Sequence, residues 1–160
     1  MVTKKEGEEL IKLARKVIES RLDGLDFDEM HLGKVSHLNK NQGVFVTIKI
    51  NGELRGCIGY PLPVFPLYEA VMRSSDAAAF NDPRFPPLSK KEYGKIKLEL
   101  SVMTNPKKIS VVKLEDYKKK VKVGQDGLIV SFHGYSGLLL PQVATEYGWD
   151  AEDFLGQTCV

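Results

Sequence analysis

Apolar and polar residues alternate in two segments of the chain, Val44–Ile50 and Ile96–Val102. In the first segment Val44, Val46 and Ile48 share one face, because successive side chains of a strand point to opposite sides. The second segment repeats the pattern, with the polar residues Lys97, Glu99 and Ser101 between its apolar ones. A period of two is typical of half-buried strands, so both segments are predicted to be β-strands.

A β-hairpin is predicted at the Asn51-Gly52 pair, because both residues tolerate the positive φ angles of a type I′ turn. The second strand of this hairpin is predicted over Glu53–Gly59. A two-residue loop gives the cross-strand partners Ile50 with Glu53, Ile48 with Arg55, and Val46 with Cys57.

This register places Arg55 and Cys57 on the aliphatic side of the sheet, beside Val46 and Ile48. An unpaired charge is very costly to bury. We therefore expect a carboxylate, a set of carbonyls or a bound anion beside Arg55. A longer loop would shift the register and move these side chains to the other face.

Apolar residues recur every three or four positions over Glu6–Leu22 and Leu67–Phe80, which predicts two amphipathic helices. Thr3 and Glu6 have capping-box spacing at the start of the first helix, and Gly24 is a natural stop after it. Shorter helices are predicted to begin at three further sites, Ser89 with Glu92, Pro141, and Asp150.

The lysines between residues 118 and 122 are the only basic cluster in the chain. They are interpreted as the solvated edge of a strand over residues 120–123, since lysine protects exposed strand edges from aggregation. Another strand is predicted over residues 127–133, followed by a turn at Gly134–Gly137.

Antiparallel strand signals interleaved with helices predict an α+β fold. We expect a mainly antiparallel sheet flanked by helices, with a smaller second lobe. One domain is predicted over residues 1–160, and the proline-rich segments 61–66 and 83–87 are candidate divisions between its lobes.

Charge and composition narrow the choice of partners. The 160 residues include 23 basic and 21 acidic side chains, so the net charge of +2 gives no strong signal for nucleic acid or an anionic membrane. No apolar run approaches the roughly 18 residues that span a bilayer, and the N-terminus has no apolar signal core. We therefore predict a cytoplasmic protein.

The cysteines and histidines form no recognisable set of metal ligands. Two cysteines are far apart in the sequence, and two of the histidines, His31 and His37, lie in a polar segment without ligand spacing. We expect no bound metal and no organic cofactor. A disulfide between Cys57 and Cys159 is disfavoured for a chain of this intracellular character.

The residues Leu54–Gly59 combine a cation with a thiol. Arg55 and Cys57 are two positions apart in a predicted strand, so they are expected to project together over Gly56. A positive charge beside a thiol holds an anion or lowers the pKa of the thiol. Gly56 and Gly59 leave room for close approach of a ligand or of another backbone.

The loop Asn81–Pro87 is stiff, because its three prolines restrict φ. Asp82 and Arg84 in this loop form either a surface contact or the rim of a binding cleft. We predict a cleft between this loop and the Leu54–Gly59 strand, with Arg55 and Cys57 on one wall.

Two classes of function follow from these residues. In an enzyme, Cys57 is the nucleophile, Arg55 anchors an anion and His133 is the base, since a thiol needs a base or a cation to attack. In a non-catalytic binding module, Cys57 is a buried structural thiol and His133 is a turn residue. Gln142 serves helix packing or surface hydrogen bonding in that second class.

Five motifs give the chain a family likeness, and the first is Leu54-Arg55-Gly56-Cys57-Ile58-Gly59. The others, in order, are Asp82–Pro86, Gly127–Val130, Ser136–Val143 and Gly148–Asp150. The set resembles the AMMECR family, named for the Alport syndrome, mental retardation, midface hypoplasia and elliptocytosis chromosomal region, in an archaeal or bacterial version.

The resemblance implies an α+β domain with a smaller lobe, and it implies that the Leu54–Gly59 signature is the family's site. It implies no particular reaction. It does imply a place in a biomolecule-modification system, with Memo-like and radical-SAM proteins as partners, and a C-terminal segment beyond Val160. Ligand or protein binding is then expected at the signature and loop residues Leu54, Gly56, Ile58, Gly59, Asp82 and Arg84, and at Gln142.

Overall fold

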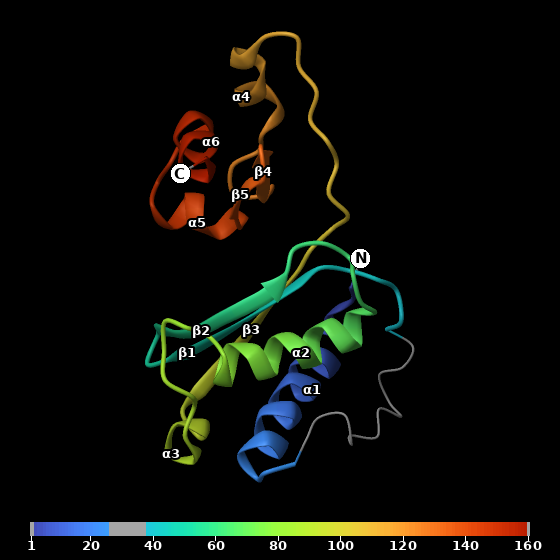
Figure 1. The fold of residues 1–160 in the computed structure, drawn as a ribbon, viewed down its shortest axis with the longest axis vertical. Helices are drawn as coiled ribbons and strands as arrows, with labels where there is room; N and C mark the ends of the chain where they lie inside the picture. Colours follow the sequence, from blue (N-terminus) through green and yellow to red (C-terminus); the bar gives the residue numbers. More distant parts are fainter. Residues whose placement is uncertain (1, 26–37, 160) are drawn as a thin grey trace. The chain divides into compact units, whose positions relative to one another are not determined.

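The computed structural model describes residues 2–25 and 38–159 and divides the chain into two compact units, residues 1–106 and 107–160 (Figure 1). Both contain helices and antiparallel strands, as the α+β prediction requires. The segment with His31 and His37 lies outside the described residues. The first unit contains α1 (Lys4–Leu22), β1 (Val44–Ile50), β2 (Glu53–Tyr60), α2 (Leu67–Phe80), α3 (Lys90–Tyr93) and β3 (Ile96–Val102).

Strands β1 and β2 form the predicted hairpin. Asn51 and Gly52 connect them with φ angles of 55° and 89°, in the left-handed region that a tight hairpin turn requires. Strand β3 pairs antiparallel with the other side of β1, so the sheet order is β2-β1-β3. In this sheet β2 and β3 are therefore the edge strands.

The predicted hairpin register is wrong beyond the first two residue pairs. A bulge at Arg55 adds one residue to β2, so Gly56 rather than Arg55 pairs with Ile48. Cys57 consequently pairs with Thr47, away from the aliphatic face of β1. The loop has the expected two residues, and the bulge alone causes the shift.

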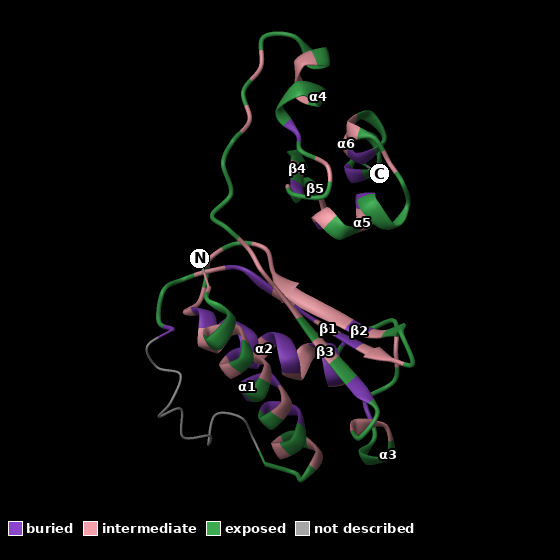
Figure 2. Ribbon diagram, turned by 180° about the vertical axis from the view of Figure 1, so that it is seen from behind, coloured by how far each residue is buried: buried purple, intermediate pink, exposed green. Residues whose placement is uncertain are grey.

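Helices α1 and α2 cover one face of the sheet, and their buried residues turn towards it (Figure 2). The predicted Thr3–Glu6 capping box begins α1, and the Ser89–Glu92 box begins α3. The core between helices and sheet contains fully buried aliphatic residues from α1, β1 and α2, including Leu10, Val17, Ile18, Val44, Val46, Ile48, Leu67 and Val71.

The second unit has a small core of its own, formed by Val121, Leu128, Ala144 and Phe154. Its elements are a 3₁₀ turn η2 (Leu114–Asp116), α4 (Tyr117–Lys120), β4 (Leu128–Phe132), β5 (Tyr135–Leu139), α5 (Pro141–Glu146) and α6 (Ala151–Thr158). The two strands form one antiparallel hairpin.

Two predictions for this unit are wrong. Residues 120–123 form no strand, because the lysines belong to α4 and the loop after it, while Val121 and Val123 pack on the core. The turn before β5 is His133-Gly134, with φ angles of 46° and 88°, rather than Gly134–Gly137. Within the described residues, no helix is long and apolar enough to cross a membrane.

Candidate functional site

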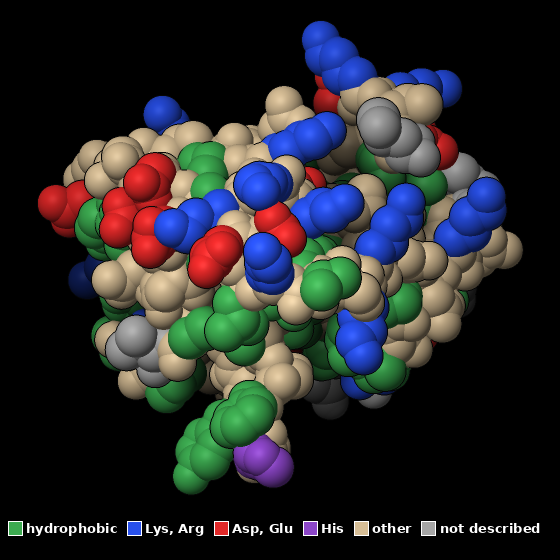
Figure 3. Space-filling model, turned by 90° about the horizontal axis from the view of Figure 1, so that it is seen from above, with side chains coloured by type: hydrophobic (Ala, Val, Ile, Leu, Met, Phe, Trp, Pro, Cys, Tyr) green, Lys and Arg blue, Asp and Glu red, His purple; other side chains and the backbone are tan. Residues whose placement is uncertain are grey.

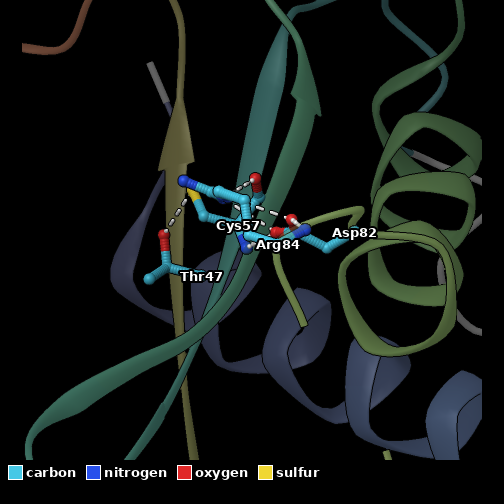
Figure 4. A network of polar contacts seen from close by, with 4 residues as sticks. All are labelled: Thr47, Cys57, Asp82 and Arg84. Carbon is cyan, nitrogen blue, oxygen red and sulfur yellow. Dashed lines mark hydrogen bonds and ion pairs between the residues drawn. The ribbon is translucent and has the colours of Figure 1, made fainter. Parts of the chain in front are cut away.

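The backbone of Cys57 faces outward from the edge of the sheet. Its amide donates to Oδ2 of Asp82 at 2.9 Å, and its carbonyl accepts from the Arg84 guanidinium at 3.0 Å. On an edge strand these two groups have no neighbouring strand to bond. The loop after α2 therefore completes the hydrogen bonding of β2 at Cys57 (Figure 4).

Asp82 is the buried centre of this arrangement, with 3% of its surface exposed. Its carboxylate accepts from the Arg84 side chain at 2.7 and 3.0 Å and from the Arg84 amide at 3.1 Å. The hydrogen bonds from Arg84 lower the pKa of Asp82 from 3.8 to about 2, although burial opposes this. The same contact raises the pKa of Arg84.

Of the three kinds of partner expected for Arg55, the structure shows a carboxylate together with one carbonyl. Its guanidinium donates to both oxygens of Glu92, at 2.8 and 3.4 Å, and to the carbonyl of Pro86 at 2.8 Å. The Arg55 side chain is only 12% exposed. Hydrogen bonds from Arg55, and then from Ser89, lower the pKa of Glu92 from 4.5 to about 2.

An aromatic ring lies between the two guanidinium groups. The Phe85 ring centroid is 5.8 Å from the guanidinium carbon of Arg55 and 5.6 Å from that of Arg84. Both distances are within the range of cation–π attraction. Phe85 therefore contacts both cations, so that the Arg55–Glu92 and Arg84–Asp82 ion pairs belong to one continuous set of contacts.

The glycines of the signature are sites of close backbone approach. A Cβ atom on Gly56 would lie 2.1 Å from the carbonyl oxygen of Ala78 in α2. A Cβ atom on Gly59 would lie 2.2 Å from the carbonyl oxygen of Val44. Both distances are far inside van der Waals contact. The glycines thus allow β2 to sit directly against its neighbours.

The Cys57 thiol is partly buried and lies 3.3 Å from the Thr47 hydroxyl on β1. Figure 4 shows Thr47 on one side of Cys57 and Asp82 on the other, with Arg84 overlapping Cys57 in this view. Among the hydrogen bonds of the described residues, this contact is the one made by the thiol. Both cysteines, Cys57 and Cys159, are free.

Strand β2 and the Asn81–Pro87 loop are neighbours, as the sequence predicted. They are joined by the hydrogen bonds of Arg55, Asp82 and Arg84, and an open cleft between them stays a prediction. The rest of the signature lies nearby, with Leu54 exposed and Ile58 packed against the core.

His133 and Gln142 belong to the second unit. His133 is exposed in the β4–β5 turn, with its ring 4.3 Å from that of Phe132. Figure 3 shows exposed hydrophobic side chains beside a histidine, and Tyr135, the first residue of β5 after this turn, is 82% exposed. Gln142 is exposed on α5. The pairing of His133 with Cys57 stays a prediction.

The sequence did not identify two of the contact residues, Thr47 and Glu92. Glu92 had a visible local role as a capping residue, and its second role depends on Arg55, which is 37 positions away. Thr47 was visible only as a polar position in a strand. Among the described residues, no three His, Cys, Asp or Glu side chains form a group that could hold a metal ion.

Archaeal proteins are similar to this chain over nearly its whole length. A Sulfolobus acidocaldarius protein is 51% identical over 161 residues, which cover 96% of this chain and 70% of that protein. A Methanothermobacter thermautotrophicus protein is 46% identical over 159 residues, covering 99% of this chain and 83% of the relative.

A solved structure has the same fold. The crystal structure of an uncharacterized protein from Pyrococcus horikoshii matches with a TM-score of 0.91 and 43% identity, covering 99% of this chain and 80% of that one. The AMMECR1 family model matches residues 11–160. The shared sequence, the shared fold and the motifs on β2 agree, and the chain belongs to the AMMECR1 family.

Proposed function

We propose that this AMMECR1-family protein is a non-catalytic binding module in which the Leu54–Gly59 signature is structural. One observation supports this proposal most directly: the charged side chains around the signature already have partners within the protein. Arg55 is bound by Glu92, and Arg84 is bound by Asp82 and by the carbonyl of Cys57. An anion site needs donors that are free to bind the anion, and the Nε and Nη2 donors of both guanidinium groups are already bound within the protein.

The partner that we propose is a protein. The face of β1 away from the helices carries an aromatic ring, a hydroxyl and a cation, in Phe45, Thr47 and Lys49, all partly exposed. This mixture suits protein recognition, since non-obligate interfaces are about as polar as the rest of the surface. By family resemblance, Memo-like and radical-SAM proteins of a modification system are the partners to test.

An enzyme with Cys57 as its nucleophile is the second candidate function, and one observation favours it. The Cys57 thiol is partly exposed and lies on the strand to which Arg84 is bound. A nucleophilic cysteine requires exposure and a nearby cation. In this alternative the predicted cleft admits the substrate.

Thiol alkylation separates the two candidates, because the exposed Cys159 is an internal reference. Native protein is treated with iodoacetamide near neutral pH, and the two cysteine peptides are quantified by mass spectrometry. The binding module predicts slower alkylation of Cys57 than of Cys159, with equal rates after denaturation. Faster native alkylation of Cys57 would support the enzyme and contradict our proposal.

Direct binding tests the proposed partners. Purified Memo-like or radical-SAM protein from the same organism is titrated into this protein by calorimetry. We expect binding that a Cys57→Ala variant retains, because the thiol is not part of the function. Absence of binding to both proteins, or loss of binding in a folded Cys57→Ala variant, would reject the proposal.

A further inference from the structure

The signature contributes two side chains to the face of the sheet that lies away from the helices. Directly opposite residues of paired strands share a face. Leu54 pairs with Lys49, and Cys57 pairs with Thr47, and both of these β1 residues lie on the outer face. Residues three positions apart in a regular strand would point to opposite faces. Leu54 and Cys57 share a face because the bulge at Arg55 lies between them.

One end of this outer face combines an exposed leucine with two lysines. Lys49 is flanked by Leu54 on β2 and by Lys97 on β3, since it pairs directly with both. Leu54 is 43% exposed, and Lys97 is exposed as well. The side chains of Leu54, Lys49 and Lys97 form one row across the three strands, next to the turn between β1 and β2. We call these three residues the hairpin-end row.

The hairpin-end row has an excess of positive charge. Lys49 and Lys97 are directly opposite one another, and like charges at such positions repel. Glu99 contacts Lys49 at 3.0 Å, but Glu99 lies opposite Thr47, outside the row. Two cations and one carboxylate leave a net positive charge, so a carboxylate of a ligand is attracted to this end of the face.

The spacing of the row determines which ligand fits it. Neighbouring strands are about 4.8 Å apart, so the point midway between the two lysines lies about 7 Å from Leu54. In an extended peptide, side chains two positions apart point to the same side and are also separated by about 7 Å. An acidic and an aliphatic side chain with one residue between them therefore reach the lysines and Leu54 at the same time.

We propose that the hairpin-end row recognises an extended segment of a partner protein in which an acidic and an aliphatic residue are two positions apart. This inference rests on the proposed binding function, in which the outer face of the sheet meets the partner. The carboxylate binds the ammonium groups of Lys49 and Lys97, and the aliphatic side chain packs on Leu54. A phosphate-bearing ligand would use the lysines alone and would leave the exposed leucine without a role.

Three short synthetic peptides of serine and glycine test the proposal. The first contains a glutamate two positions before a leucine, the second has glutamine instead of that glutamate, and the third has serine instead of that leucine. Each is titrated into the full chain, with amide chemical shifts as the readout. We expect the first peptide to shift the amides of Leu54, Lys49 and Lys97, and the other two to bind more weakly.

Three results of this titration would overturn the proposal. The first is an absence of shifts at the hairpin-end row with the first peptide. The second is equal binding of all three peptides, which would mean that neither the carboxylate nor the aliphatic side chain is recognised. The third is that inorganic phosphate, titrated separately, produces the same shifts as the first peptide, which would mean that the lysines bind anions in general.

Variants of the protein test the two halves of the row. Leu54→Ser and Lys97→Glu should each weaken binding of the first peptide about threefold or more. Leu62→Ser is the matched control for the leucine, because Leu62 is 50% exposed and lies outside the row. Lys12→Glu, on an exposed position of α1, is the control for the charge. Binding that survives either variant of the row, or that falls equally in the controls, would reject the proposal.

The same variants separate this inference from the proposed function. If a Memo-like or radical-SAM protein binds the parent, Leu54→Ser and Lys97→Glu equally well, the proposed function is supported and recognition by the hairpin-end row is rejected. If the first peptide binds at the row and neither protein binds, the row is supported and the proposed partners are rejected.

Discussion

Within the described residues, strands β2 and β3 are the two edges of one sheet. The backbone groups that point away from the sheet have different partners on the two strands. At β2, Asp82 and Arg84 bind both backbone groups of Cys57. At β3, among the described residues, Arg15 binds one carbonyl and the strand pairs with nothing else on that side. The two loop residues that the sequence offered as the rim of a cleft, Asp82 and Arg84, are thus the ones that bind the β2 edge at Cys57.

This difference shows why residue type alone is an uncertain guide to function. An arginine beside a cysteine suggests chemistry, and in this sheet Arg55 binds the Glu92 carboxylate and the Pro86 carbonyl, while the Cys57 thiol contacts the Thr47 hydroxyl. On the plainer strand, β3, the contact found within the described residues is that of Arg15 with the Ile96 carbonyl. Five predictions test the contrast, from the largest expected effect to the smallest.

The close packing behind β2 is the most sensitive feature. Gly56→Ala would place a Cβ atom 2.1 Å from the Ala78 carbonyl oxygen, so the strand or helix must shift. We expect a loss of about 3 kcal/mol in unfolding free energy, measured by urea denaturation. Gly94→Ala is the control, because nothing lies within 4 Å of its Cβ position. Equal stability of the two variants would contradict close packing at Gly56.

Acidification should weaken the β2 edge next most strongly, because it affects both carboxylates. The folded chain lowers the pKa of Asp82 from 3.8, and that of Glu92 from 4.5, to about 2. Their stabilisation is therefore complete above the unfolded pKa values and is lost as pH falls from about 5 to about 2. Unfolding free energy measured across this range should fall less in an Asp82→Asn, Glu92→Gln double variant. Identical pH profiles of the parent and the double variant would show that Asp82 and Glu92 do not cause the loss of stability in acid.

Removing one carboxylate should have a smaller effect. Asp82→Ala leaves the Cys57 amide and the Arg84 guanidinium without their acceptor, which should cost about 2 kcal/mol in a urea melt. Asp23→Ala breaks the exposed Lys90–Asp23 pair and should change stability by less than about 0.5 kcal/mol. A loss at Asp82 no larger than that at Asp23 would show that the β2 edge does not depend on this contact.

The shape of the Arg55 side chain should contribute to the stability of the fold in addition to its positive charge. Arg55→Lys keeps a cation but cannot bind Glu92 through two nitrogens and also reach the Pro86 carbonyl. We expect a loss of about 1 kcal/mol. Arg55→Ala should lose more, because it leaves the Glu92 carboxylate without its cation. A thermal melt of Arg55→Ala that matches the parent would contradict a structural role for this pair.

A substitution at Lys97 on β3 should have the smallest effect on the stability of the single chain. Lys97→Glu should alter unfolding free energy by less than about 0.5 kcal/mol. A small gain is expected, because the new carboxylate faces Lys49. A large destabilisation would mean that β3 is held by contacts at Lys97 within the chain, and the contrast between the two edges would disappear.

Features that depend on neighbouring residues could be predicted from the sequence alone. The bounds of β1 and α2 were predicted to the residue, β3 was predicted from its alternating pattern, and the capping boxes at Thr3 and Ser89 were predicted correctly. Hydrophobic periodicity and turn chemistry determine such elements within a few residues of chain. The family followed from the order of the motifs.

The register of β2, the partners of Arg55 and the surroundings of Cys57 were decided only by the tertiary structure. The bulge brings Gly56 opposite Ile48, where the Ala78 carbonyl leaves no room for a side chain. Arg55 meets Glu92 37 positions later, and Cys57 meets Asp82 25 positions later. Local pattern contains no information on such distances. The sequence therefore determined which residues make up the signature strand, and long-range packing determined what those residues do there.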